Sequence, residues 1–206
     1  TDQMTVDLQS LQDGVIREDT VWTIGHGPSA DYSSLHAAMD AARKHTIRSN
    51  ATLTMRVSDG TYTLTSPLNL NHAQGQHIYI TGNTKHPENV TLYYVGKEAA
   101  VEINTGHSMR MFRGFTIQGQ KSGVGIRVQD HSYASFGDLV VTEFEDGIVY
   151  EGGSAGYLIE GTVRIENTTA NGLFAIGNSH VMASEIEIEG AGGIGALAVI
   201  GSVLDI

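Results

Sequence analysis

Residues 115–206 can be written as four aligned segments: FTIQGQKSGVGIRVQDHSYASFGD (115–138), LVVTEFEDGIVYEGGSAGYLIEGT (139–162), VRIENTTANGLFAIGNSHVMASE (163–185) and IEIEGAGGIGALAVIGSVLDI (186–206). Each segment opens with a short apolar alternation, and the starts lie 24, 24 and 23 residues apart. A period kept through four units is typical of a repeat protein, in which each unit buries its apolar face only against its neighbours.

Two further series keep nearly the same period, one built on glycine and an apolar residue and the other on a turn that contains serine. Each unit therefore supplies two or three short strands with turns between them. The first series is Gly125-Ile126, Gly147-Ile148, Gly172-Leu173 and Gly195-Ala196; the second is His107-Ser108, His131-Ser132, Gly153-Ser154 and Ser179-His180.

Other repeat folds fit this period less well. Leucine-rich repeats carry an L-x-x-L-x-L signature, which is missing here, and a propeller blade needs about 40–50 residues. A coil of a β-helix equals one repeat. The sequence therefore predicts an all-β protein, a right-handed parallel β-helix (solenoid) with one short N-terminal capping helix.

Stacking in this fold predicts specific neighbours, because equivalent residues of adjacent coils lie roughly 4.8 Å apart. Arg164 and Glu187 occupy equivalent outward positions and should face each other. We expect an inward aliphatic ladder along the same strands, formed by Ile117, Val141, Ile165 and Ile188.

The N-terminal half reads as an entry strand at 21–24, a helix and then further strands. Leu35, Ala38, Met39 and Ala42 recur at helical spacing after Asp31-Tyr32-Ser33-Ser34. We expect residues 1–20 to form an arm or lead-in and residues 21–206 to form the β-helix domain, C-terminally truncated or continuing, because the sequence stops within an apolar run.

Composition narrows the possible functions. The net charge of −11 disfavours nucleic acid and anionic membranes as partners. There are no cysteines, so disulfides and thiol chemistry are excluded. No run of 18 apolar residues is present, so no membrane insertion is expected, and the N-terminal TDQMTVDLQ shows no signal peptide.

The N-terminal half resembles the first coils of the pectin-lyase-like superfamily, and pectin methylesterases in particular. In that superfamily a helix of this type caps the open end of the β-helix, an arrangement also common in phage tail spikes and fibres. The resemblance covers roughly residues 21–200. The matching stretches are Val21–Ile24, Asp31–Ala42, Val57–Tyr62 and Ile78–Gly82.

The esterase motifs of this family are only partly present. The resemblance places Asp146 on the family's acid/base aspartate, with Glu145 in place of the preceding glutamine. Gly161-Thr162-Val163-Arg164 resembles the stretch that ends in the nucleophilic aspartate, so Arg164 occupies the nucleophile position. An arginine cannot form the acyl intermediate. We therefore expect no catalytic residues, with Asp146 as the one weak candidate.

Metal and cofactor sites are also not expected, although lyases of this superfamily bind calcium through clustered acidic residues. Glu185, Glu187 and Glu189 alternate along one predicted strand and are interpreted as a solvated face, with a cation-binding ladder as the alternative. His107 and His131 are interpreted as turn residues rather than as metal ligands. The acidic candidates for calcium are Asp130, Asp138, Glu143, Glu145, Asp146 and Glu151.

Tyr133 and Tyr157 recur 24 residues apart and are predicted to form a ligand-binding column, because aromatic rings offer apolar faces to sugars. The leading hypothesis is a non-catalytic, receptor-recognition segment of a phage or phage-like spike or fibre. It would be a homotrimer, virion-bound or extracellular, that binds cell-surface glycans and other virion structural proteins. The alternatives are a polysaccharide lyase or hydrolase of the superfamily and a secreted bacterial β-helix adhesin.

Overall fold

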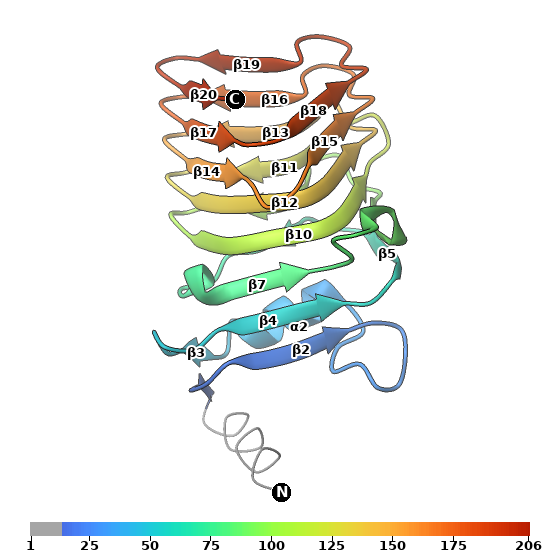
Figure 1. Cartoon of the computed structure of the whole chain (residues 1–206), viewed down its shortest axis with the longest axis vertical. Helices are drawn as coiled ribbons and strands as arrows, with labels where there is room; N and C mark the ends of the chain where they lie inside the picture. The colour runs from blue at the N-terminus through green and yellow to red at the C-terminus, as the bar shows by residue number, and fades with distance from the viewer. Residues whose placement is uncertain (1–13) are drawn as a thin grey trace, which may run out of the picture.

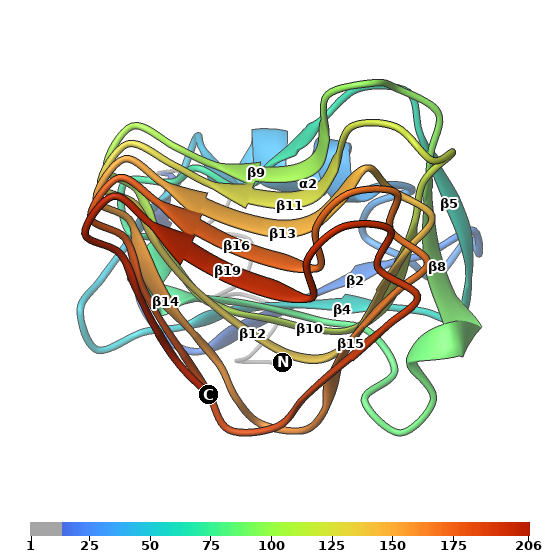
Figure 2. The same ribbon diagram turned by 90° about the horizontal axis from the view of Figure 1, so that it is seen from above.

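The computed structural model describes residues 14–206, and the first part of the expected N-terminal arm, residues 1–13, lies outside them. The described chain is an all-β, parallel solenoid of about six turns (Figure 1). As the chain climbs from its N-terminal end, it passes from the front strands around one side to the back strands. This path makes the solenoid right-handed (Figures 1 and 2). The predicted fold class is therefore confirmed.

Two large parallel sheets form the walls of the solenoid, and we call them the front sheet and the back sheet. A small pair, β1 (Val15–Ile16) and β3 (Thr46–Ile47), lies at the N-terminal end. The back sheet consists of β6 (Leu68–Asn69), β9 (Ala99–Ile103), β11 (Val124–Val128), β13 (Asp146–Glu151), β16 (Leu173–Ile176) and β19 (Ala196–Val199).

The front sheet has twelve strands because its long central strands, β10 and β12, each pair with two shorter strands of a neighbouring coil. Its members are β2 (Thr20–Ile24), β4 (Leu53–Val57), β5 (Gly60–Leu64), β7 (Ile78–Thr81), β8 (Val90–Tyr94), β10 (Ser108–Gln118), β12 (Tyr133–Thr142), β14 (Ala155–Leu158), β15 (Val163–Glu166), β17 (His180–Ala183), β18 (Ile186–Glu189) and β20 (Val203–Asp205).

The coil-to-coil register of the front sheet follows the sequence repeat. Ile117 pairs with Val141, Val141 with Ile165, and Ile165 with Ile188. The first three are fully buried and Ile188, in the last coil, is half-buried, so the predicted ladder is confirmed. Arg164 lies opposite Glu187 as predicted.

The glycine series lies on the back sheet, where Ile126 pairs with Ile148 and Ile148 with Leu173. At Gly125, Gly147 and Gly172, the position before the apolar residue has no room for a side chain. A Cβ on Gly147 would lie 2.4 Å from Cγ2 of Ile165 and 2.6 Å from the carbonyl oxygen of Gly172. Glycine therefore recurs here because the front-sheet ladder fills the space.

The serine series forms a ladder at one corner, in a register that differs from the sequence alignment. The Ser154 hydroxyl accepts a hydrogen bond from the Ser132 backbone N–H, and the Ser179 hydroxyl accepts one from Ser154, each at 3.2 Å. Because Ser108 pairs with Tyr133, His107 aligns with Ser132, and the His107-Ser108 alignment was wrong by one residue. Ser202 extends the ladder by accepting from the Ser179 N–H.

The N-terminal end is closed by α2 (Leu35–Ala42), which packs against β2 and β6 at the edge of the back sheet (Figure 2). The Ser34 hydroxyl caps the helix by accepting from the Ala37 N–H. The predicted apolar stripe is buried. In the part of the chain that the structure describes, no helix is long and apolar enough to cross a membrane.

Candidate functional site

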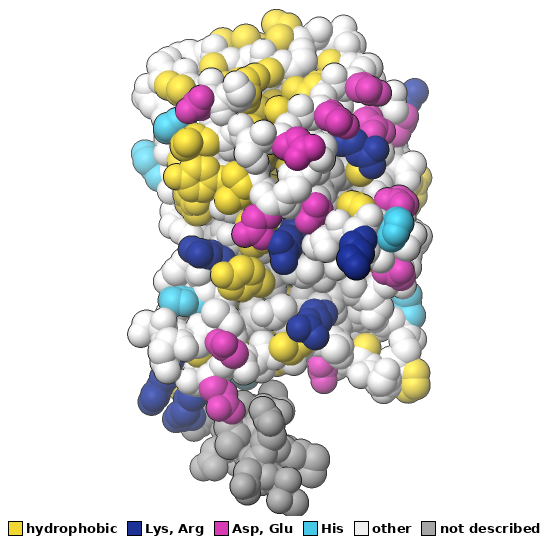
Figure 3. All heavy atoms as spheres, in the orientation of Figure 1, with side chains coloured by type: hydrophobic (Ala, Val, Ile, Leu, Met, Phe, Trp, Pro, Cys, Tyr) yellow, Lys and Arg dark blue, Asp and Glu magenta, His cyan; other side chains and the backbone are white. Residues whose placement is uncertain are grey.

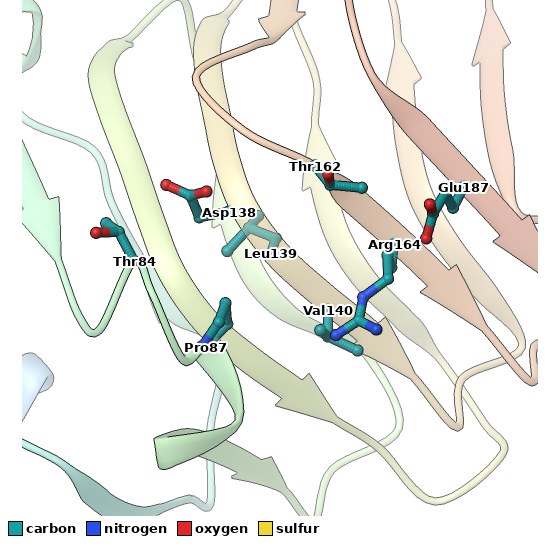
Figure 4. A pocket seen from close by; sticks show the side chains of 8 residues that line it. All are labelled: Thr84, Pro87, Asp138, Leu139, Val140, Thr162, Arg164 and Glu187. Carbon is teal, nitrogen blue, oxygen red and sulfur yellow. The ribbon is translucent and has the colours of Figure 1, made fainter.

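A hollow lined by several polar side chains lies on the outer face of the front sheet (Figure 4). A groove of about 270 Å³ runs between β12, β15 and β18 on one side and the segment joining β7 to β8 on the other. This segment carries the short helix η2 (Pro87–Asn89). The groove is lined by Thr84, Pro87, Asp138, Leu139, Val140, Thr162, Arg164 and Glu187.

Asp138 occupies the bend of β12, with its backbone in the left-handed region at a φ of 45°. Its carboxylate packs on Gly161, since a Cβ there would lie 1.8 Å from Oδ1 of Asp138. Burial raises the pKa of this carboxyl above its ordinary value; the charge of Arg113 lowers it, and that of Glu160 raises it further. Arg113 and Glu160 themselves form an ion pair. Asp138 is thus a half-buried carboxyl beside an ion pair.

Farther along the sheet side of the groove, a cation lies among hydroxyl and carboxylate groups. Arg164 and Glu187 lie side by side on β15 and β18. The Arg164 guanidinium also lies 3.9 Å from the carboxylate of Glu166 on its own strand, and its side chain is 43% exposed. The Thr162 hydroxyl donates to Glu185 at 2.7 Å. The Arg164 guanidinium, the Thr162 hydroxyl and the Glu187 carboxylate therefore place hydrogen-bond donors and acceptors close together in the groove.

An apolar patch adjoins this polar region on the same face, over the left ends of the upper front strands in Figure 3. Tyr157 is 37% exposed and Met182 38% exposed. The rings of Tyr133 and Tyr157 meet edge to face, with their centroids 5.8 Å apart. A second hollow of about 450 Å³ borders the patch, lined by Tyr157, Ile159, Met182, Ala183, Ser184 and Asp205.

Tyr133 and Tyr157 do not occupy equivalent positions in adjacent coils, so the strict column expected from their spacing is wrong. Tyr133 pairs with Ala155, and Tyr157 pairs with Ser135. The chain shortens by two residues at the corner between them, which shifts the register. The two rings nevertheless contact each other diagonally, so the structure does bring the two predicted ligand-binding residues together.

Asp146 does not line the groove, and its carboxylate instead forms hydrogen bonds that join two neighbouring coils. It begins β13 in the back sheet, and its Oδ1 accepts hydrogen bonds from the backbone and side-chain N–H groups of Asn171 at 3.0 and 2.9 Å. Arg164, at the position that resembles the esterase nucleophile, lies in the front sheet. The structure therefore places the two esterase-like positions on different sheets.

The acidic candidates for calcium are dispersed among the coils. Glu143 lies 3.6 Å from the Lys121 ammonium, and Glu151 lies 3.3 Å from the guanidinium of Arg127. Within residues 14–206, no group of three or more His, Cys, Asp or Glu side chains is arranged to hold a metal ion. His131 lies in a turn, where its backbone N–H donates to the carbonyl oxygen of Gly152. His107 aligns with Ser132 rather than with His131, so the two histidines do not occupy equivalent positions.

Thr84 and Pro87 were missed by sequence reasoning. They lie in the β7–β8 connection, which protrudes from the first half of the solenoid and follows no repeat. The sequence signal for this connection was its extra length. Ile80 and Leu92 lie twelve positions apart, whereas Phe112 and Ile117, with which they pair in the next coil, lie five apart. An extra loop beside a regular sheet is a common place for a binding site.

No family model, no curated protein and no solved structure matches this chain. Inference about its role therefore rests on the geometry of the front face. That face offers two aromatic rings, an apolar hollow, and a groove in which carboxylates, hydroxyls and one guanidinium converge. Such a surface can stack against the apolar face of a ligand while exchanging hydrogen bonds with its hydroxyl groups.

Proposed function

We propose that this chain is a non-catalytic recognition segment of a phage or phage-like spike or fibre, and that it binds host cell-surface glycans on its front face. One observation carries the proposal: the aromatic pair of exposed Tyr157 and half-buried Tyr133 adjoins a groove with mixed hydrogen-bonding groups. The proposal includes a homotrimer, located on the virion or outside the cell, that contacts other virion structural proteins. These last points rest on the resemblance of the N-terminal coils.

Sugars match both halves of this surface. One face of a pyranose ring is apolar C–H surface, which packs on aromatic rings, and its edge carries hydroxyls that both donate and accept hydrogen bonds. The carboxylates of Asp138 and Glu187 can accept from hydroxyls, whereas Arg164 can donate to them. The front sheet is a rigid platform for these groups, because each strand pairs with neighbours on both sides through most of the stack.

A glycan array, followed by product analysis of the hits with and without calcium, tests this proposal. We expect binding without cleavage, and Tyr157→Ala should weaken it about tenfold, the loss of about 1.4 kcal/mol from one stacked ring. Tyr93→Ala is the matched control, because Tyr93 is also half-exposed on a front-sheet strand but lines neither hollow. Equal effects of the two variants, or no binding to any glycan, would contradict the proposal.

A second candidate, a polysaccharide hydrolase or lyase of the pectin-lyase-like superfamily, is favoured by one specific observation. Two carboxyl groups, Asp138 and Glu187, line one groove, and burial raises the pKa of Asp138 as a general acid requires. Release of shorter oligosaccharides, abolished by Asp138→Asn while binding persists, would replace the non-catalytic proposal with this one.

A further inference from the structure

A buried histidine joins the capping helix to the first full coil. His72 follows β6 and is 4% exposed. Its Nε2 lies 2.9 Å from the carbonyl oxygen of Ala42, the last residue of α2, and 3.2 Å from that of His45. Its Nδ1 accepts a hydrogen bond from the Gln74 backbone N–H at 2.9 Å. Both ring nitrogens are therefore engaged by backbone groups.

These partners fix one tautomer of the neutral ring. Nε2 must carry the proton, because it faces two carbonyl oxygens, and Nδ1 must be bare, because it faces an N–H donor. A second proton would sit on Nδ1 and point at the Gln74 N–H. The imidazolium form therefore loses one hydrogen bond and sets two donors against each other in a buried place.

The charges around His72 act in the same direction. Arg43 follows α2 and donates to the carbonyl oxygens of Asn69 and Asn71, and His107 faces the same pocket from the turn before β10. His45 lines the pocket as well, with its Nδ1 on the carbonyl oxygen of Ala41. Among residues 14–206, no acidic side chain lines this pocket. The charged or titratable side chains that line the pocket beside His72 are thus Arg43, His45 and His107, and the Arg43 guanidinium is also paired with the carboxylate of Asp40 on α2 at 2.7 Å.

We propose that His72 is a pH-sensitive latch, which holds the C-terminal end of α2 on the solenoid at neutral pH and loosens it on acidification. The latch goes beyond glycan recognition and does not depend on it. Since α2 packs against β6 at the edge of the back sheet, loosening it uncovers the N-terminal edge of that sheet. An uncovered edge can pair with another strand.

The direction of the pH dependence follows from the two states of the histidine. Burial lowers the pKa of His72 below its ordinary value, and the charges of Arg43 and His107 lower it further, against the raising effect of the bonds to Ala42 and His45. The open state therefore binds a proton more readily than the closed state. The latch is fully closed above the ordinary histidine pKa of about 6.5 and opens as the pH falls below it.

Hydrogen exchange followed by mass spectrometry on the full chain tests this at pH 7.5 and 5.0, corrected for intrinsic exchange rates. We expect opening of peptides that cover residues 34–47 and 68–76 to increase severalfold at pH 5.0, because the open state binds a proton more readily than the closed state. Peptides from residues 133–183 should change less than about twofold. His72→Gln, which cannot titrate, should remove the pH dependence of the N-terminal peptides.

His107→Gln and His86→Gln are the matched controls, and both should retain the pH dependence, because His107 only faces the pocket and His86 is exposed beside Glu88. A pH effect that survives His72→Gln, or equal opening of all coils, would overturn the proposal. Should His72→Gln fail to fold, imidazole ¹⁵N NMR of the unaltered chain decides. A His72 that titrates at or above about pH 6.5 would also overturn it.

Discussion

The N-terminal coils and the repeated coils of this solenoid are held together by different interactions. From residue 115 onward, most equivalent residues of successive coils pair in register, and buried positions form columns of apolar side chains such as Ile117, Val141 and Ile165. Before residue 105, polar side chains bind backbone groups of distant segments. Asp19 accepts from Thr52, Asp31 accepts from Thr23, and Arg43 and His72 bridge α2 to the first coil.

This difference indicates where each region is sensitive to change. A column of stacked side chains repeats the same contact in every coil, so its energy depends on burial and on the fit of neighbouring layers. The bridges from Arg43 and His72 to backbone carbonyls of distant segments are not repeated from coil to coil. We therefore expect core substitutions to be most damaging in the middle coils, whereas substitutions of outward-facing polar side chains should matter more at the N-terminal end.

The largest effect should come from a charge in the middle of the buried ladder. Ile165→Asp should lower the free energy of unfolding by more than about 4 kcal/mol, because the carboxylate would be buried without a partner. Ile188→Asp, the next position in the same column, should cost only about 1–2 kcal/mol, because Ile188 is half-buried in the last coil. Urea unfolding measures both, and equal losses would contradict the stacked-column account.

The next largest loss of stability should come from adding a side chain at a back-sheet glycine that packs against the front-sheet ladder. Gly147→Ala should cost about 1–3 kcal/mol, because the new methyl group would meet Ile165 and the Gly172 carbonyl below normal contact distance. Gly195→Ala is the matched control in the last coil, where the nearest atom would be 3.8 Å away. It should be neutral or stabilising by up to about 1 kcal/mol. The same urea experiment distinguishes them, and a tolerated Gly147→Ala would mean that the coils can separate.

Most of the repeated region could be predicted from the sequence, because the sequence repeats with the same period as the coils of the structure. The spacing of Val141, Ile165 and Ile188 equals one coil, so alignment of the sequence predicted the ladder directly. The prediction went wrong where coils differ in length at a corner. Tyr133 and Tyr157 keep the right spacing in sequence, but the shortened corner moves Tyr157 opposite Ser135.

The candidate site was harder to predict because it combines segments of both regions. Asp138 and Arg164 stood out as individual residues, but nothing local in the sequence indicates that the β7–β8 loop brings Thr84 and Pro87 to them. His72 gave no signal either. Its role depends on the carbonyl of Ala42, thirty residues earlier, and such a bridge leaves no periodic pattern in the chain.

Two serines allow the polar contacts of the regions to be compared directly. Ser154→Ala should cost about 1–2 kcal/mol, because it leaves the buried Ser132 N–H without its acceptor. Ser34→Ala at the helix N-cap should cost about 1 kcal/mol and should increase hydrogen exchange only in peptides of α2. A global rise in exchange for Ser34→Ala would show that the cap and the coils unfold as one unit.

The smallest effect should come from the outer face of the repeated coils. Arg164→Ala should lower the free energy of unfolding by at most about 1 kcal/mol, because Arg164 is 43% exposed and its ion pair with Glu166 is long at 3.9 Å. Most of that loss should vanish in 0.5 M salt, where exposed charges are screened. Glu187→Gln, on the facing strand, should behave alike. A salt-independent loss above about 2 kcal/mol would mean that the groove is desolvated and stabilises the stack, so that polar contacts would matter in the repeated coils as they do at the N-terminal end.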